Sequence, residues 1–301
     1  MRSIIPILMS AGLACSAQVK PLLEQLKDIA IKDNMQVYNI CEIKDGVSRT
    51  ISITPSSNCH NTYSVAKAFV VTAIGILDDR DYFDVDDPIY PFIIDFLPKD
   101  HSPNWRKIKI SDVMTHRCGF PRGFLDIDAQ NATKWSSTDY LSLILQLPIP
   151  DNFRDNASYS DGAFYLLSRL VTETIDQKLD DFLAKELLVP LQFREFAFSK
   201  CPQGYPIGAT GMYITTEDMA KLGQLYLQGG VYDGKRYLSK RFVDKVLARG
   251  FEFHGNPKDG YAKGGMAGQY LHFNPRTNRV IAIHSWNADI KKLMECVAKF
   301  D

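Results

Sequence analysis

Apolar residues in this chain recur at two spacings, one typical of helices and one of strands. Recurrence every three or four positions predicts helices over residues 22–31, 111–115, 139–146, 161–175, 179–188, 216–227, 239–248 and 290–299. Runs of β-forming residues predict two hairpins, 36–43 with 47–53 and 269–273 with 279–284, because a short turn separates the members of each pair. Strands are therefore predicted at both ends of the sequence and helices in the middle.

This order predicts an α/β (α+β) fold with a mainly antiparallel sheet, assembled from both ends of the chain and covered by helices on both faces. We expect residues 1–77 and 200–301 to form the sheet domain and residues 78–199 to form an inserted all-helical domain. A length of 301 residues suits one large domain or two closely joined ones.

One further helix, predicted to begin near Asn61, is apolar on nearly every side and should be buried. Its start carries Ser64-Val65-Ala66-Lys67, the single Ser-x-x-Lys of the chain. Residues three apart share a helical face, so the Lys67 amine can reach the Ser64 hydroxyl, which needs a neighbouring base to become a nucleophile. We expect burial to lower the pKa of Lys67 toward that of a useful base.

A second candidate element, Tyr-Ser-Asp-Gly at positions 159–162, stands directly before a predicted helix. Tyr159 is a candidate proton shuttle for Ser64. The alternative is purely structural: Ser160 or Asp161 caps the helix and Tyr159 packs as an ordinary aromatic residue.

A third element, Lys-Gly-Gly-Met-Ala-Gly at positions 263–268, leads into the predicted strand 269–273. Glycines beside a site let a substrate approach the backbone closely. The alternative is an ordinary Gly-rich turn, since Lys-x-Gly also occurs at Lys44 and Lys258.

Together, Ser-x-x-Lys, Tyr-Ser-Asp and Lys-Gly-Gly resemble the three motifs of the serine β-lactamase and penicillin-binding-protein superfamily. The likeness is greatest to its class C-like branch, which also contains family VIII-type carboxylesterases and D-amino-acid peptidases. It extends to residues 110–120, 159–173 and 208–220 and covers most of residues 35–285. It implies a β-lactamase/transpeptidase-like fold, an active site in the cleft between the two domains and an acyl-enzyme mechanism.

The resemblance also implies a role for each motif residue. Ser64 would attack the carbonyl, with Lys67 and Tyr159 as the base for acylation and later for activating water. The backbone N–H groups of Ser64 and Met266 would form the oxyanion hole. Lys263 would hold a substrate carboxylate or reinforce the positive field.

Two departures from the family pattern affect the expected substrate. Asp161 stands where the family more often has Asn. In the Lys-Gly-Gly segment, Gly264 stands where the family usually has Thr or Ser, and Gly265 follows it. Without that hydroxyl, one hydrogen bond to a substrate carboxylate is missing, worth about 1.5–3 kcal/mol when the partner is charged. We therefore expect a small ester or amide substrate that lacks the full β-lactam-type anchor.

The sequence thus predicts a serine acyl-hydrolase acting on a small-molecule ester, amide or β-lactam, without a cofactor or metal ion. A D,D-peptidase or penicillin-binding protein is one alternative, and a catalytically silent sensor or binding module is another. The oligomeric state stays open.

Composition narrows these classes. Lys plus Arg and Asp plus Glu both number 35, which disfavours a nucleic-acid partner, and no segment approaches the ~20 apolar residues of a membrane span. The six cysteines are scattered without Cys-x-x-Cys, which disfavours zinc and favours a reducing, cytoplasmic location. A signal-like stretch within residues 1–17 keeps a secreted or periplasmic location as the alternative.

Other chemically capable side chains are expected to be structural. His116 and His272 lack metal-like spacing or a Ser-His-Asp pattern. Cys59 lies close to Ser64 in sequence, but nothing in the sequence marks a base for it, so we expect it to pack.

Overall fold

The computed structural model describes residues 20–301, so the signal-like stretch and Cys15 lie outside the described residues. The helices are α1 (Leu22–Lys32), α2 (Ala66–Asp78), α3 (Tyr90–Ile93), α4 (Ile110–Met114), α5 (Tyr140–Leu145), α6 (Asp161–Ile175), α7 (Leu179–Leu183), α8 (Thr216–Leu227), α9 (Lys240–Arg249) and α10 (Ile290–Val297). Short 3-10 turns are η1 (Tyr63–Val65), η2 (Ile94–Phe96), η3 (Pro103–Lys107), η4 (Ala132–Lys134) and η6 (Met266–Gly268), and α7 continues into a π-helical turn, η5 (Ala184–Leu188).

The strands are β1 (Gln36–Lys44), β2 (Val47–Ser52), β3 (His60–Asn61), β4 (Phe196–Phe198), β5 (Met212–Ile214), β6 (Val231–Tyr232), β7 (Lys235–Arg236), β8 (His254–Asn256), β9 (Gly260–Gly265), β10 (Gln269–Asn274) and β11 (Arg279–Trp286). Six of them form one sheet in the order β2-β1-β11-β10-β9-β8, with every neighbouring pair antiparallel. β1 pairs with β11, which confirms the antiparallel sheet assembled from both ends of the chain.

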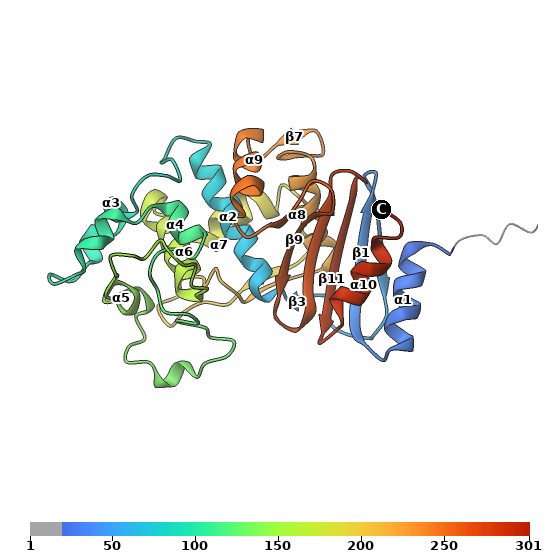
Figure 1. Ribbon diagram of the computed structural model, residues 1–301, viewed down its shortest axis with the longest axis horizontal. Helices are drawn as coiled ribbons and strands as arrows, with labels where there is room; N and C mark the ends of the chain where they lie inside the picture. Colours follow the sequence, from blue (N-terminus) through green and yellow to red (C-terminus); the bar gives the residue numbers. More distant parts are fainter. Residues whose placement is uncertain (1–19) are drawn as a thin grey trace, which may run out of the picture.

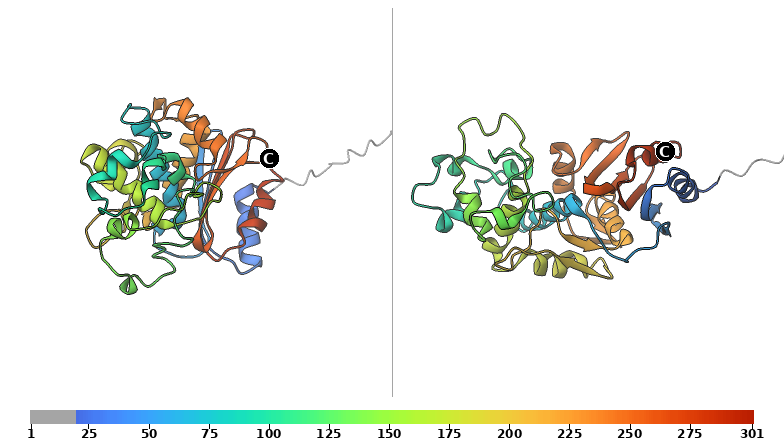
Figure 2. Two further views of the ribbon diagram at one scale, coloured as in Figure 1. Left: turned by 60° about the vertical axis from the view of Figure 1, so that its left-hand side comes forward. Right: turned by 90° about the horizontal axis from the view of Figure 1, so that it is seen from below.

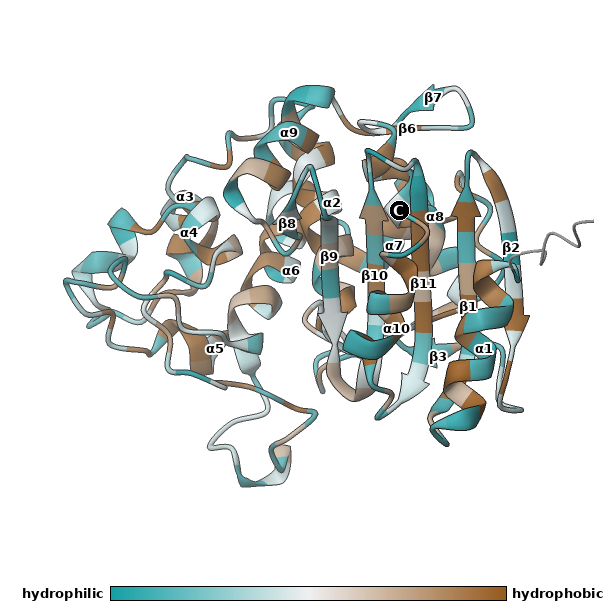
Figure 3. Ribbon diagram, turned by 45° about the vertical axis from the view of Figure 1, so that its right-hand side comes forward, coloured by the Kyte–Doolittle hydropathy of each residue, from teal (hydrophilic) through white to brown (hydrophobic). Residues whose placement is uncertain are grey.

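Helices cover both faces of this sheet, as predicted (Figure 1). On one face, α1 and α10 pack together against apolar side chains of β1 and β11. On the other face, α8 contacts β1, β10 and β11. The close approach of α8 depends on Gly223, where an added Cβ would lie 2.6 Å from Val280 Cγ1. Figure 3 shows the central strands as largely hydrophobic, which is the pattern of a sheet buried on both faces.

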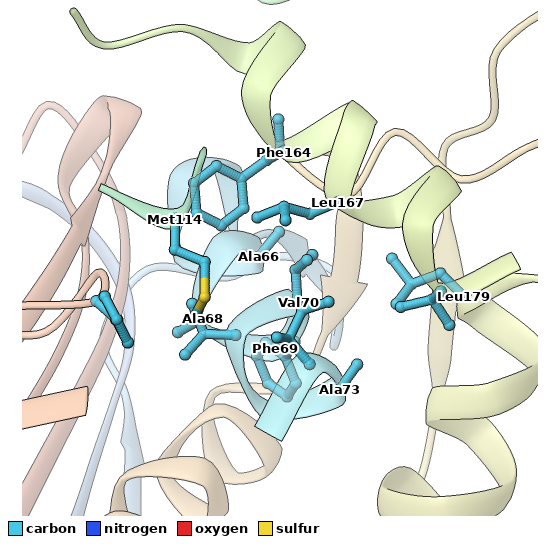
Figure 4. Packing of buried hydrophobic residues seen from close by; sticks show 14 of the residues in the cluster. Ala66, Ala68, Phe69, Val70, Ala73, Met114, Phe164, Leu167 and Leu179 are labelled. Atoms are coloured by element: carbon cyan, nitrogen blue, oxygen red, sulfur yellow. The ribbon is translucent and has the colours of Figure 1, made fainter. Parts of the chain in front are cut away.

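The helix α2 runs through the middle of the molecule, and every one of its residues is buried. Figure 4 shows its apolar side chains between Met114 of α4, Phe164 and Leu167 of α6, and Leu179 of α7. Because α2 is hydrophobic on all sides it can pack against neighbours on all sides. The residues at its start are thereby held by the core of the protein.

The helices α3 to α6 gather at the end of the molecule away from the sheet (Figure 2). One hydrophobic cluster nevertheless extends from these helices through α2 to the sheet. Phe196–Phe198, placed by the sequence in the inserted domain, pairs with β5 in a small sheet of order β3-β5-β4. The boundaries at residues 77 and 200 stay a prediction.

The Lys-Gly-Gly segment, predicted to lead into the strand at 269–273, forms a strand itself. It lies in a strand of its own, β9, antiparallel to β10, and η6 connects the two strands. Glycine is a poor strand former, so pairing with β10 determines the extended conformation here. None of the helices within residues 20–301 combines the length and the hydrophobicity that a transmembrane span requires.

Candidate active site

Ser64 lies in the 3-10 turn that leads into α2. Asn61 holds this turn, because its Oδ1 accepts hydrogen bonds from the Tyr63 N–H at 2.9 Å and the Gly211 N–H at 3.2 Å. Tyr63 adopts a left-handed conformation with φ of 46°, which is costly for a residue with a Cβ. The turn therefore presents a half-buried Ser64 side chain from a constrained backbone.

Lys67 is fully buried, and its ammonium group donates three hydrogen bonds. Its Nζ donates to Ser64 Oγ at 3.1 Å, to Asp161 Oδ1 at 2.8 Å and to the Ala209 carbonyl at 2.8 Å. The contact with Ser64 is the one that the Ser-x-x-Lys spacing predicts.

The predicted direction of the Lys67 pKa shift is wrong. Burial does disfavour the ammonium, but the charges of Asp161, Tyr159 and Glu252 outweigh burial and raise the pKa. Asp161 is itself buried, so the two form an internal ion pair. Lys67 is therefore held as an ammonium ion at neutral pH.

Tyr159 completes the contacts of the nucleophile. Its hydroxyl donates to Ser64 Oγ at 2.7 Å, and 37% of the residue is exposed. The Lys67 Nζ lies 4.8 Å from the centre of its ring and the Lys263 Nζ lies 5.7 Å from it. A tyrosine oxygen in contact with Ser64 Oγ is in position to exchange a proton with it.

His116 contacts the residues on both sides of Tyr159. The sequence predicted a structural role for His116, and these contacts show that it supports Tyr159. Its carbonyl accepts from the Ser158 N–H at 2.7 Å, and its Nδ1 accepts from the Ser160 N–H at 3.3 Å. Its ring lies 4.4 Å, centre to centre, from the ring of Tyr159. These contacts hold the residues on either side of Tyr159 and one side of its ring.

Glu252 is a site residue that the sequence analysis missed. Since His116 Nδ1 is an acceptor, Nε2 carries the proton and donates to Glu252 Oε1 at 3.0 Å. The second oxygen of Glu252 pairs with Lys263. Burial alone would raise the pKa of Glu252, but Lys263 and His116 lower it well below its usual value. The sequence did offer one sign of a buried carboxylate here, because Glu252 stands between two phenylalanines, Phe251 and Phe253.

The Lys263–Glu252 pair bears on the predicted role of Lys263. The ammonium is buried and already has a carboxylate partner, so a substrate carboxylate would have to displace Glu252. This geometry disfavours Lys263 as the anchor of a substrate anion.

Gly265 brings β9 against the nucleophile turn. A Cβ at this position would lie 2.5 Å from the Thr62 carbonyl oxygen and 3.3 Å from the Ser64 backbone nitrogen. Met266 follows directly, and its side chain is exposed. The oxyanion hole formed by the N–H groups of Ser64 and Met266 stays a prediction, and this contact places their backbones in one neighbourhood.

Gly265→Ala should displace β9 from the nucleophile turn and reduce acylation of Ser64 by about tenfold or more, because the clash is with backbone atoms that cannot rotate away. The matched control is Gly264→Ala, where the new Cβ would lie 3.8 Å from Tyr270 Cδ2, an ordinary contact. Rates of labelling by a fluorophosphonate measure the difference. Equal labelling rates in the two variants would show that this close approach is not required.

Three carboxylates near the site are candidate cation ligands. Oxygen atoms of Asp126, Asp128 and Asp161 lie within 4.8 Å of one another. Burial raises the pKa of Asp128, and the charges of Asp161 and Asp126 raise it further. The Lys67 ammonium already neutralises Asp161, so we assign no metal ion to this cluster.

Cys59 and His272 lie outside these contacts. Cys59 contacts Glu195, and burial together with that carboxylate raises its pKa to about 11, so it is not an activated thiol. His272 is buried and its Nε2 bonds to the Asp259 carbonyl, while burial lowers its pKa.

Comparison with known families agrees with this geometry. The profile of the family described as Beta-lactamase matches residues 49–289, which include the nucleophile turn, Tyr159 and β9. The chain belongs to the beta-lactamase family. Within it, the three motifs make the chain class C-like.

Solved structures share the fold of this beta-lactamase-family protein. FmtA from Staphylococcus aureus superposes with a TM-score of 0.72 at 14% identity, over 93% of this chain and 86% of FmtA. A family VIII carboxylesterase gives a TM-score of 0.71 at 12% identity, over 92% of this chain and 96% of the esterase. At these identities the likeness establishes the β-lactamase/transpeptidase fold.

A curated relative matches part of the sequence. The N-acetylmuramyl-L-alanine amidase of Bacillus subtilis (strain 168) is 25% identical over 143 residues, 44% of this chain and 32% of the amidase. The match therefore spans about a third of the amidase's length.

Proposed function

We propose that this protein is a serine acyl-hydrolase that acts on a small ester or amide through an acyl-enzyme on Ser64. The observation that carries the proposal is the contact of Ser64 Oγ with both Lys67 Nζ and the Tyr159 hydroxyl. A silent binding module has no need for a half-buried serine in contact with both a buried ammonium group and a tyrosine hydroxyl.

In the proposed mechanism, Tyr159 as phenolate takes the proton of Ser64 while Ser64 Oγ bonds to the substrate carbonyl carbon. The tetrahedral intermediate collapses when Tyr159 returns the proton to the departing oxygen or nitrogen. Tyr159 then takes a proton from water as the water oxygen attacks the acyl carbon. It returns that proton to Ser64 Oγ when the second tetrahedral intermediate breaks the ester bond and releases the acid. Lys67 stays an ammonium ion throughout and favours the negative charge on Tyr159 and on Ser64 Oγ.

Two features of β9 support an ester or amide that does not use this strand as a carboxylate anchor, over a β-lactam. Gly264 supplies no hydroxyl, and the Lys263 charge is paired with Glu252. The carboxylate found on penicillins and cephalosporins would therefore lack two partners on β9. The family VIII carboxylesterase fold supports the ester class by analogy alone.

A rate comparison tests the proposal: 4-nitrophenyl butyrate, a chromogenic cephalosporin and a D-alanyl dipeptide are each supplied to the purified protein. We expect kcat/KM for the ester to exceed that for the cephalosporin by about tenfold or more, in line with a missing hydrogen bond to a charged group. A faster cephalosporin or peptide reaction would favour the β-lactamase or D,D-peptidase alternatives. Absence of turnover and of Ser64 acylation would favour the sensor alternative.

A further inference from the structure

Tyr159 forms one wall of a cavity that the proposed mechanism does not use. The cavity has a volume of about 360 Å³, within the range of small-molecule sites. Its other charged or titratable walls include Arg117, Arg122, Arg249 and Glu252. A ligand in this cavity would contact the same Tyr159 whose hydroxyl touches Ser64.

The charges around this cavity do not cancel. Glu252 is already bonded to His116 and Lys263, and Arg249 is paired with Asp86 at 2.9 Å. Arg117 donates to the carbonyls of Arg154 at 2.7 Å and Asp155 at 3.1 Å, which carry no charge.

Arg122 is exposed, and in the described part of the chain it has no carboxylate partner. With Arg117 it leaves two guanidinium charges unneutralised at the cavity. An anion is the complement of such a wall, and a guanidinium binds the planar carboxylate through two parallel hydrogen bonds.

The backbone of the loop that carries Arg122 is hydrogen-bonded to Tyr159. The next residue, Gly123, donates its N–H to the Tyr159 carbonyl at 2.8 Å. The loop that carries Arg122 is thus tied to the residue that exchanges a proton with Ser64. An anion bound by Arg122 in this cavity therefore lies on the Tyr159 side of the site.

We propose that the cavity binds the carboxylate of an acidic substrate, so that the enzyme hydrolyses esters or amides that carry a free carboxylate on their acyl part. This inference rests on the proposed function and names its substrate class. Arg122 and Arg117 then provide the anchor that Gly264 and the paired Lys263 do not provide on β9.

The test compares 4-nitrophenyl hemiglutarate with 4-nitrophenyl butyrate, which is similar in length and uncharged. We expect kcat/KM to favour the hemiglutarate by about tenfold in the unmodified protein, and this ratio to fall about tenfold in Arg122→Gln. Arg49→Gln is the matched control, since Arg49 is exposed on β2, at the opposite edge of the sheet from β8. It should leave the ratio unchanged.

Titration calorimetry with glutarate gives a readout that does not depend on turnover. We expect binding to the unmodified protein and to Arg49→Gln, and about tenfold weaker binding to Arg122→Gln. Turnover of both esters without a charge preference would overturn this inference and leave the proposed function standing. If neither ester acylates Ser64 while glutarate binding depends on Arg122, the proposed function is overturned and the anion site is supported. Glutarate binding that is absent or insensitive to Arg122 would overturn the site.

Discussion

Ser64→Ala should eliminate covalent labelling by a fluorophosphonate and reduce ester hydrolysis by about a thousandfold or more, because it removes the hydroxyl that contacts both Lys67 and Tyr159. Intact-protein mass spectrometry measures the adduct, and initial rates measure the turnover. The variant should fold, since it removes a half-buried hydroxyl and leaves Lys67 bonded to Asp161 and Ala209.

The matched control is Ser57→Ala, a serine exposed on the surface seven positions before the nucleophile. It should keep both labelling and turnover. An adduct that persists in Ser64→Ala would show that another residue is the nucleophile, and Cys59 is the first to check by peptide mapping.

Asp161→Ala should destabilise the protein by about 3–5 kcal/mol, because it leaves the fully buried Lys67 ammonium without its carboxylate. Asp161→Asn should cost less, since its amide oxygen still accepts a hydrogen bond from Lys67 Nζ. Urea unfolding at several pH values measures the loss.

The pH dependence has a definite sign. The pKa of Lys67 is raised in the folded protein, so its contribution to stability is complete below the pKa of the unfolded chain and is lost as pH rises through the folded value. The difference between the unmodified protein and the Asp161 variants should therefore be full at neutral pH and shrink as the solution becomes strongly alkaline.

Asp244→Asn is the control for Asp161→Asn. Asp244 pairs with Lys240 one helical turn away, with both side chains more than half exposed, so its loss should cost less than about 0.5 kcal/mol. Equal stability of the two Asn variants at neutral pH would show that burial of the Lys67–Asp161 pair carries no energetic consequence.

Much of the fold could be predicted from local pattern. α6 and α8 lie at their predicted bounds, and both hairpins form where β-forming runs flank short turns. The strand β9 could not be predicted as a separate strand, because Gly264 and Gly265 have low strand propensity and the pairing with β10 determines their conformation.

In the candidate site, too, some contacts could be predicted from sequence spacing and others arise from packing. The contact between Ser64 and Lys67 follows from sequence spacing alone, since both residues lie within one helical turn. The motif pattern also marked Tyr159 and the Lys-Gly-Gly segment as candidates to join them. The charge pairing of the site depends on the folded chain, because Asp161 and Glu252 approach Lys67 and Lys263 through packing rather than sequence spacing. The field of these carboxylates outweighs burial at Lys67, and no local pattern contains that balance.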